Sequence, residues 1–246
     1  MSVGGRYRGL DFYLKWSLGN WAEEITYKFC REEVAPKLGV HIYRYGYSAG
    51  RIPKSLVEFK EIQRERSRLE FGKRPNFLLF SQQFAQRHDE ELSRLMRKPD
   101  SEVEDLVRGA VLAIEVEQSM WSVKRATTSL SFTVKEEDVQ PLKAWVHRFE
   151  VPIVVFQVFV DELHASPLEE ILNKGKLDYD PTIKKKVYFL EVSPQTRLAD
   201  IKNVGFYAKV EFDEKGRLVP FVMLEGGTFT NMNTDAIRKL AEFFKK

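Results

Sequence analysis

The feature that most constrains the fold is an apolar run from Ile153 to Val160, which follows Pro152 and is broken only by Gln157. A strand with apolar side chains on both faces has to be covered on both faces, as in the middle of a sheet with helices on either side. The run therefore predicts an α/β fold with a mixed central sheet flanked by helices on both faces.

The rest of the chain alternates between helical and strand patterns, and 246 residues are enough for one sizeable domain. Helices are expected over Leu10–Leu38, Pro53–Leu69, Gln82–Met96, Lys135–Phe149, Pro167–Asn173 and Thr234–Lys246. Strands are expected over Val40–Tyr47, Phe77–Phe80, Val111–Glu117, Lys186–Val192, Gly205–Phe212 and Leu218–Leu224. We expect a single domain over residues 1–246, with a core over 10–165 and a C-terminal β-rich extension over 166–246 on which the last helix packs.

The strand expected at Val111–Glu117 ends in two acidic residues. Since successive strand side chains point to opposite faces, Glu115 and Glu117 share one face, while Ile114 and Val116 take the other face and belong to the core. Two neighbouring carboxylates on so apolar a strand repel each other and resist burial. A cation between them would relieve both problems, so the segment predicts a divalent-metal site.

A second strand begins at Pro75-Asn76 and continues through the buried run to Phe80. Neighbouring strand ends bring residues that are distant in sequence together, so Asn76 is expected beside Glu115 and Glu117. Acidic oxygens that converge on Mg²⁺ serve phosphodiester cleavage, because the metal neutralises the phosphate and lowers the pKa of a bound water.

Three segments, Gly72–Phe80, Ala113–Trp121 and Val154–Asp161, resemble the PD-(D/E)xK nuclease superfamily and, within it, AccI-like type II restriction endonucleases. In that pattern Pro-Asp opens one strand, acid-x-Lys lies on the next, and a helix follows. The resemblance covers roughly Leu10 to Asp161, and its motifs are short and of moderate specificity. It implies a Mg²⁺-dependent enzyme of the prokaryotic cytoplasm that cuts double-stranded DNA at a short palindrome as a homodimer. Mn²⁺ can then replace Mg²⁺, and Ca²⁺ supports binding without cleavage.

The chain departs from this pattern at two positions. Asn76 stands where Asp is usual and offers an oxygen without charge, either as a natural impairment or as a deliberate inactivating change. Glu117 stands where Lys is usual. The resemblance therefore implies Asn76, Glu115 and Glu117 as metal ligands, and Lys124 is the candidate for the missing catalytic lysine, although a surface charge or phosphate contact is the plainer reading of Lys124.

Further acids and DNA contacts come from helices and loops. Glu24 and Glu61 are candidates to complete the metal shell, although helical surface glutamates are usually only solvated. The segment from Arg44 to Arg74 contains nine basic and four acidic residues. This basic excess suits either the binding of a polyanionic substrate or a solvated charged helix. The expected DNA-binding residues are Arg51 and Lys54 beside a Gly-rich loop, Arg64 and Arg68 one helical turn apart, and Arg125.

Other functional classes receive little support from the sequence. Cys30 is the only cysteine, which excludes a disulfide framework and a multi-cysteine zinc site, and its spacing predicts a core thiol. No apolar run approaches the ~18 residues of a membrane span. The sequence favours a core position over a stacking role for Trp16, Trp21, Trp121 and Trp145, and Trp121 is close enough to the acidic site to pack under it. Three alternatives remain open: a catalytically silent DNA-binding protein on a nuclease scaffold, a repair or junction nuclease, and a structural domain in which Glu115 and Glu117 are an exposed strand end.

Overall fold

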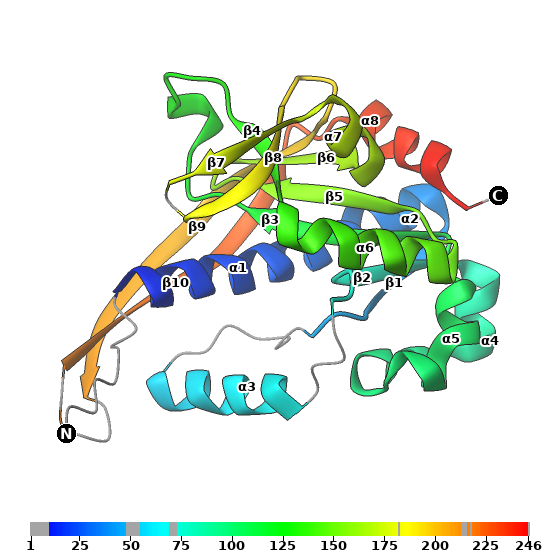
Figure 1. The fold of residues 1–246 in the computed structure, drawn as a ribbon, viewed down its shortest axis with the longest axis horizontal. Helices are drawn as coiled ribbons and strands as arrows, with labels where there is room; N and C mark the ends of the chain where they lie inside the picture. Colours follow the sequence, from blue (N-terminus) through cyan, green and yellow to red (C-terminus); the bar gives the residue numbers. More distant parts are fainter. Residues whose placement is uncertain are drawn as a thin grey trace.

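A seven-stranded mixed sheet forms the centre of the protein (Figure 1). The structure is a computed structural model, and it describes residues 10–47, 55–68, 73–181, 183–212, 216 and 218–245. The strand order is β1-β2-β3-β5-β6-β9-β10. The bounds are β1 Val40–Arg44, β2 Phe77–Ser81, β3 Leu112–Gln118, β5 Ile153–Val158, β6 Glu162–Pro167, β9 Arg197–Phe212 and β10 Leu218–Thr230. Strands β3 and β5 are parallel, and the other neighbours are antiparallel. The expected α/β fold is confirmed.

Helices cover both faces of this sheet. One face carries α1 (Leu10–Phe29), its π-helical continuation η1 (Cys30–Val34), α2 (Ala35–Leu38) and the C-terminal α8 (Thr234–Lys239) with the turn η4 (Leu240–Phe243). The other face carries α4 (Gln82–Leu92), η2 (Leu95–Arg97), α5 (Asp100–Arg108), α6 (Glu136–Phe149) and α7 (Leu168–Lys174). The basic helix α3 spans Leu56–Arg68. Within the described part of the chain, no helix combines the length and apolar character needed to cross a membrane.

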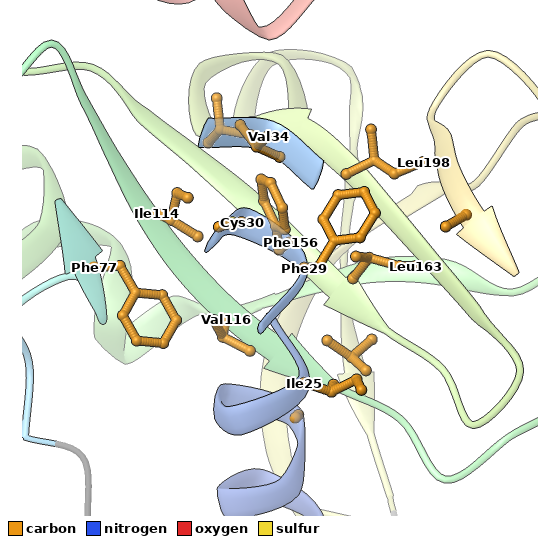
Figure 2. Packing of buried hydrophobic residues seen from close by; sticks show 14 of the residues in the cluster. Ile25, Phe29, Cys30, Val34, Phe77, Ile114, Val116, Phe156, Leu163 and Leu198 are labelled. Carbon is orange, nitrogen blue, oxygen red and sulfur yellow. The ribbon is translucent and has the colours of Figure 1, made fainter. Parts of the chain in front are cut away.

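The α1 face holds the larger of two apolar clusters (Figure 2). Phe29 and Cys30 are fully buried and pack toward Ile114, Val116 and Phe156 of the central strands. Burial raises the pKa of the Cys30 thiol well above its ordinary value, so the residue is an unreactive part of the core, as expected. Full burial of one large apolar side chain stabilises the fold by about 1.5–3 kcal/mol.

The opposite, α6 face holds the second cluster, in which Ala113 and Val155 of the sheet meet Trp145 and Phe149 of α6. A three-stranded sheet of order β4-β8-β7 adjoins it, with β4 Ser131–Lys135, β8 Lys185–Glu191 and β7 Lys176–Asp180. Sequence patterns predicted β8 but missed β4, β6 and β7. Most β7 residues are exposed and polar, so that strand carries no apolar alternation.

The C-terminal β-rich segment is a continuation of the central sheet, because β9 pairs with β6. Strands β9 and β10 form a hairpin paired from Phe212–Leu218 to Asp200–Thr230, longer than the sequence predicted. The sequence predicts a turn at 213–216 between them, of which residues 213–215 lie outside the described residues. The hairpin extends away from the body at the lower left of Figure 1. The final helix is shorter than predicted and ends in the 3-10 turn η4.

Candidate active site

Strand β3 places Glu115 and Glu117 side by side on the α6 face of the sheet. The two residues are only 3% and 7% exposed, while Ile114 and Val116 enter the cluster on the α1 face. The predicted distribution of these side chains over the two faces is therefore confirmed. Two carboxylates buried this deeply need compensation nearby.

Two lysines supply that compensation in this structure. The Lys73 ammonium forms a close ion pair with Glu115 Oε1, and its Nζ lies 3.8 Å from Asp138 Oδ2. The Lys135 Nζ lies 4.0 Å from Glu117 Oε2 and 3.7 Å from the same Asp138 oxygen. The sequence predicted a cation between the glutamates, and lysine side chains from the turn before β2 and from the end of β4 take that place.

Burial and the neighbouring charges bring the pKa of one acid in this cluster close to neutral pH. Burial raises the pKa of Glu115 to about 7, with the attraction of Lys73 opposing the rise and the charge of Glu117 adding to it. Burial also raises the pKa of Glu117. Burial acts to lower the pKa of Lys73, but Glu115, Glu117 and Asp138 outweigh it, so that its pKa is raised. A carboxyl with a pKa near 7 is suited to proton transfer at physiological pH.

Two buried polar atoms of this region have no hydrogen-bond partner within the described part of the chain: Glu115 Oε2 and Gln157 Nε2. Gln157 lies on β5 in register with Glu117, and its Oε1 accepts a hydrogen bond from the Thr133 amide at 2.9 Å. A buried polar atom without a partner is costly and rare in native proteins. The unengaged Glu115 oxygen is suited to receive a cation or a water molecule.

Asn76 lies beside the acidic pair but turns away from it. Its Oδ1 accepts a hydrogen bond from the Val116 amide at 2.8 Å, and its Nδ2 donates to Glu23 Oε1 at 3.1 Å. Glu23 belongs to α1, which covers the opposite face of the sheet. Among the described residues, no hydrogen bond joins Asn76 to Glu115 or Glu117. These contacts do not bring the three expected ligands together: the Asn76 amide contacts the backbone between the two acids and Glu23 of α1.

The turn that carries Lys73 and Asn76 is held by a buried network. The Arg74 side chain is 4% exposed, lies 2.6 Å from Asp100 Oδ1 and donates to the Lys98 carbonyl at 2.8 Å. The Tyr45 hydroxyl donates to the same Asp100 oxygen at 2.6 Å. These contacts fix the turn, and with it the positions of Lys73 and Asn76, because a charged group buried this fully cannot move without losing its partners.

Lys124 is placed away from the acidic pair. Its Nζ forms an ion pair with Asp200 at 2.7 Å, and within the described residues no ion pair joins it to Glu115 or Glu117. Of the two additional acids considered, Glu24 binds Arg44 through two hydrogen bonds at 2.8 and 2.9 Å, and Glu61 is exposed.

The structure describes only some of the predicted DNA-binding residues. Arg64 is exposed on α3, and Arg125 is exposed in the loop after β3. Arg51 and Lys54 lie outside the described residues, as does the side chain of Arg68. Among the described residues, no group of three or more His, Cys, Asp or Glu side chains could hold a metal ion.

Sequence reasoning missed five residues of this region: Glu23, Lys73, Lys135, Asp138 and Gln157. Lys73 stands close before Pro75-Asn76 and was counted only as part of the basic stretch. The sequence pattern predicts Lys135 as the first residue of a helix, whereas it ends β4. The register of β3 against β5 brings Gln157 beside Glu117, and no local pattern carries that information.

The comparisons with known proteins add no relative: no family model, curated protein or solved structure matches this chain.

Proposed function

We propose that this chain is a divalent-metal-dependent endonuclease of the restriction type, with the acidic pair Glu115 and Glu117 as the core of its active site, and that Asn76 weakens its cleavage. The observation that carries the proposal is the burial of these two carboxylates on the α6 face with Glu115 Oε2 unpartnered. Both carboxylates are buried, so the alternative in which they form an exposed strand end does not hold.

The order of elements supports the same proposal. A strand follows Asn76, its neighbour β3 carries the acidic pair, and α6 leads to the parallel strand β5. This is the order that the resemblance to PD-(D/E)xK nucleases implies for residues 10–161. The substrate would be double-stranded DNA with a specific short sequence, bound by a homodimer whose two-fold symmetry matches a palindrome.

The donor set fits Mg²⁺ in kind. Glu115 and Glu117 offer oxygens of the type that Mg²⁺ prefers, and one Glu115 oxygen is unengaged. When bound, Mg²⁺ supplies charge neutralisation at the phosphate and a water of lowered pKa. Mn²⁺ would act in the same way, and Ca²⁺ would support binding alone.

The two lysines have separate tasks in this proposal. Lys73 is partly exposed, with 28% of its side chain accessible, so its ammonium can leave Glu115 for a phosphate oxygen when DNA enters. Lys135 stays beside Glu117 and orients its carboxylate. In this proposal Lys124 has no catalytic role. It forms an ion pair with Asp200 and would serve as a structural residue or contact a DNA phosphate.

Cleavage of a plasmid mixture tests the proposal. Asn76→Asp adds a carboxylate next to Val116, and we expect it to cut DNA in Mg²⁺ or Mn²⁺ at least about tenfold faster than the parent chain. Asn76→Ala is the matched control without the added charge. Glu115→Gln combined with Asn76→Asp should abolish cutting. Sequencing of the cut ends would give one recurrent sequence. Absence of Mg²⁺-dependent cutting by Asn76→Asp would overturn the nuclease assignment.

One observation favours a second candidate, a DNA-binding protein that does not cut. Asn76 is satisfied by hydrogen bonds at both ends of its amide, and Lys73 already balances Glu115, so the native contacts hold together without a metal. This candidate predicts a gel shift with DNA in Ca²⁺ and no cleavage even after Asn76→Asp. A preference for branched over plasmid DNA would instead indicate a repair or junction nuclease.

A further inference from the structure

The loop between β3 and β4 exposes a large aromatic side chain, Trp121, four residues after Glu117 in the sequence. The loop begins after Gln118, the last residue of β3, and leads into β4, which ends at Lys135; the Lys135 Nζ lies 4.0 Å from Glu117 Oε2. Trp121 in this loop is 66% exposed, in contrast to Trp21 at 1% and Trp145 at 4%. The expectation that Trp121 belongs to the core or packs under the site is therefore wrong.

This exposure occurs on a loop that is firmly held. The Asp161 carboxylate accepts hydrogen bonds from the Ser122 hydroxyl and from the amides of Val123 at 2.8 Å and Lys124 at 3.1 Å. The Trp121 carbonyl accepts from the Val160 amide at 3.3 Å. In Figure 1 the segment projects from the body at the upper left, drawn in green. A fixed backbone that presents an unburied indole is preorganised for contact with another molecule.

The exposed residues on either side of Trp121 in the sequence favour a nucleic acid. Met120 is 48% exposed, and Arg125 is exposed without an ion pair in the described part of the chain. An exposed aromatic face and an exposed guanidinium four positions apart on one loop suit a base and its phosphate. A second copy of the chain is less suited, because two exposed side chains provide far less than the roughly 800 Å² per partner of a standard protein interface.

We propose that Trp121 stacks on an unpaired or extruded base of the DNA substrate while Arg125 contacts a flanking phosphate. The inference rests on the proposed function, since it uses the same substrate and places the base next to the acidic pair. A paired base inside a duplex offers no free face, so the preferred ligand has a base outside the helical stack. The loop would hold that base while the phosphate lies at Glu115 and Glu117.

Binding to two short duplexes in Ca²⁺ buffer, one fully paired and one with a single unpaired base, tests this inference. We expect tighter binding of the second duplex and quenching of exposed tryptophan emission, which Trp121→Phe removes from the signal. Trp121→Ala should weaken binding of the second duplex about tenfold, whereas Trp121→Phe keeps most of the affinity. Arg125→Gln should lower the salt dependence by about one phosphate contact. Thermal unfolding of all variants should match the parent, because the side chains are exposed.

The outcomes separate this inference from the proposed function. If the parent binds DNA and Trp121→Ala binds both duplexes equally well, the stacking role is overturned and the nuclease proposal is untouched. If Trp121→Ala instead changes the oligomeric state without changing DNA affinity, the loop is a protein interface and the inference is again overturned. If the parent binds neither duplex, the inference fails, and cleavage by Asn76→Asp decides the proposed function by itself.

Discussion

Replacing Asn76 by Asp gives the sharpest test of the geometry around the acidic pair. The carboxylate can still accept the hydrogen bond from the Val116 amide, but it can no longer donate to Glu23, whose Oε1 lies 3.1 Å from the Asn76 nitrogen. The change therefore sets two carboxylates against each other. At this separation, with an effective dielectric constant of about 20, the repulsion is about 5 kcal/mol.

The expected loss of stability is smaller than this bare repulsion. Glu23 and Asn76 are both only half-buried, so solvent screens the pair, and a proton shared between the carboxylates relieves it further at acid pH. With the lost hydrogen bond included, we expect Asn76→Asp to lower the free energy of unfolding by about 3 kcal/mol at pH 8 in EDTA. For a chain of this length the midpoint of thermal unfolding then falls by about 6–12 °C.

The matched control exchanges the two groups. In Glu23→Gln with Asn76→Asp the amide and the carboxylate trade places, so the hydrogen bond returns and stability in EDTA should come back to within about 1 kcal/mol of the parent. A divalent cation should stabilise the single variant, by about 2.7 kcal/mol at one hundred times its dissociation constant, and the exchanged pair much less. If the single variant is as stable as the parent in EDTA, the contact between Glu23 and Asn76 does not exist as described.

Two further predictions concern the charges on the α6 face. Because the pKa of Glu115 is raised from 4.5 to about 7, the folded state binds the extra proton between these values, so stability should fall by about 3 kcal/mol as pH rises through that window. Glu115→Gln should remove this part of the pH dependence in urea unfolding at pH 5 and pH 8, and equal slopes in the two proteins would contradict the raised pKa. Lys73→Met removes the ammonium that pairs with Glu115 and should cost about 3 kcal/mol at pH 8 and less at pH 5, where Glu115 is protonated. The control Lys37→Met breaks only an i,i+4 surface pair with Glu33 and should cost less than about 1 kcal/mol, so similar losses in the two variants would refute a buried role for Lys73.

The central strands could be predicted because their information is local. The alternation around Glu115 fixes which side chains enter the core, and the apolar run from Ile153 fixes a strand covered on both faces. Both features depend only on the two-residue period of a strand. The site residues on β3 followed directly from the same period.

The partners of those residues could not be predicted, because they depend on tertiary placement. Glu23 and Asn76 are 53 positions apart and meet only because α1 crosses the sheet beside the start of β2. Lys73 reaches Glu115 because the buried Arg74 fixes the turn before β2, which carries Lys73. Strand β4 alternates between half-buried and buried residues, so a strand could be predicted there. Because charged residues follow it, the sequence pattern instead predicts a helix that starts at Lys135, one residue before α6.

The departures from the nuclease pattern are linked by charge. An acid at position 76, Glu115 and a lysine at position 117 would together carry one net negative charge. Here Glu115, Glu117 and Asp138 face Lys73 and Lys135, and the fully ionised cluster again carries one net negative charge. The two lysines thus offset the acid that stands at position 117 and the neighbouring Asp138. Because a buried site tolerates little excess charge, a divalent cation would bind here most readily when a DNA phosphate arrives with it. In the proposed nuclease, Asn76 would therefore shift the site from one that holds metal by itself toward one that needs its substrate to do so.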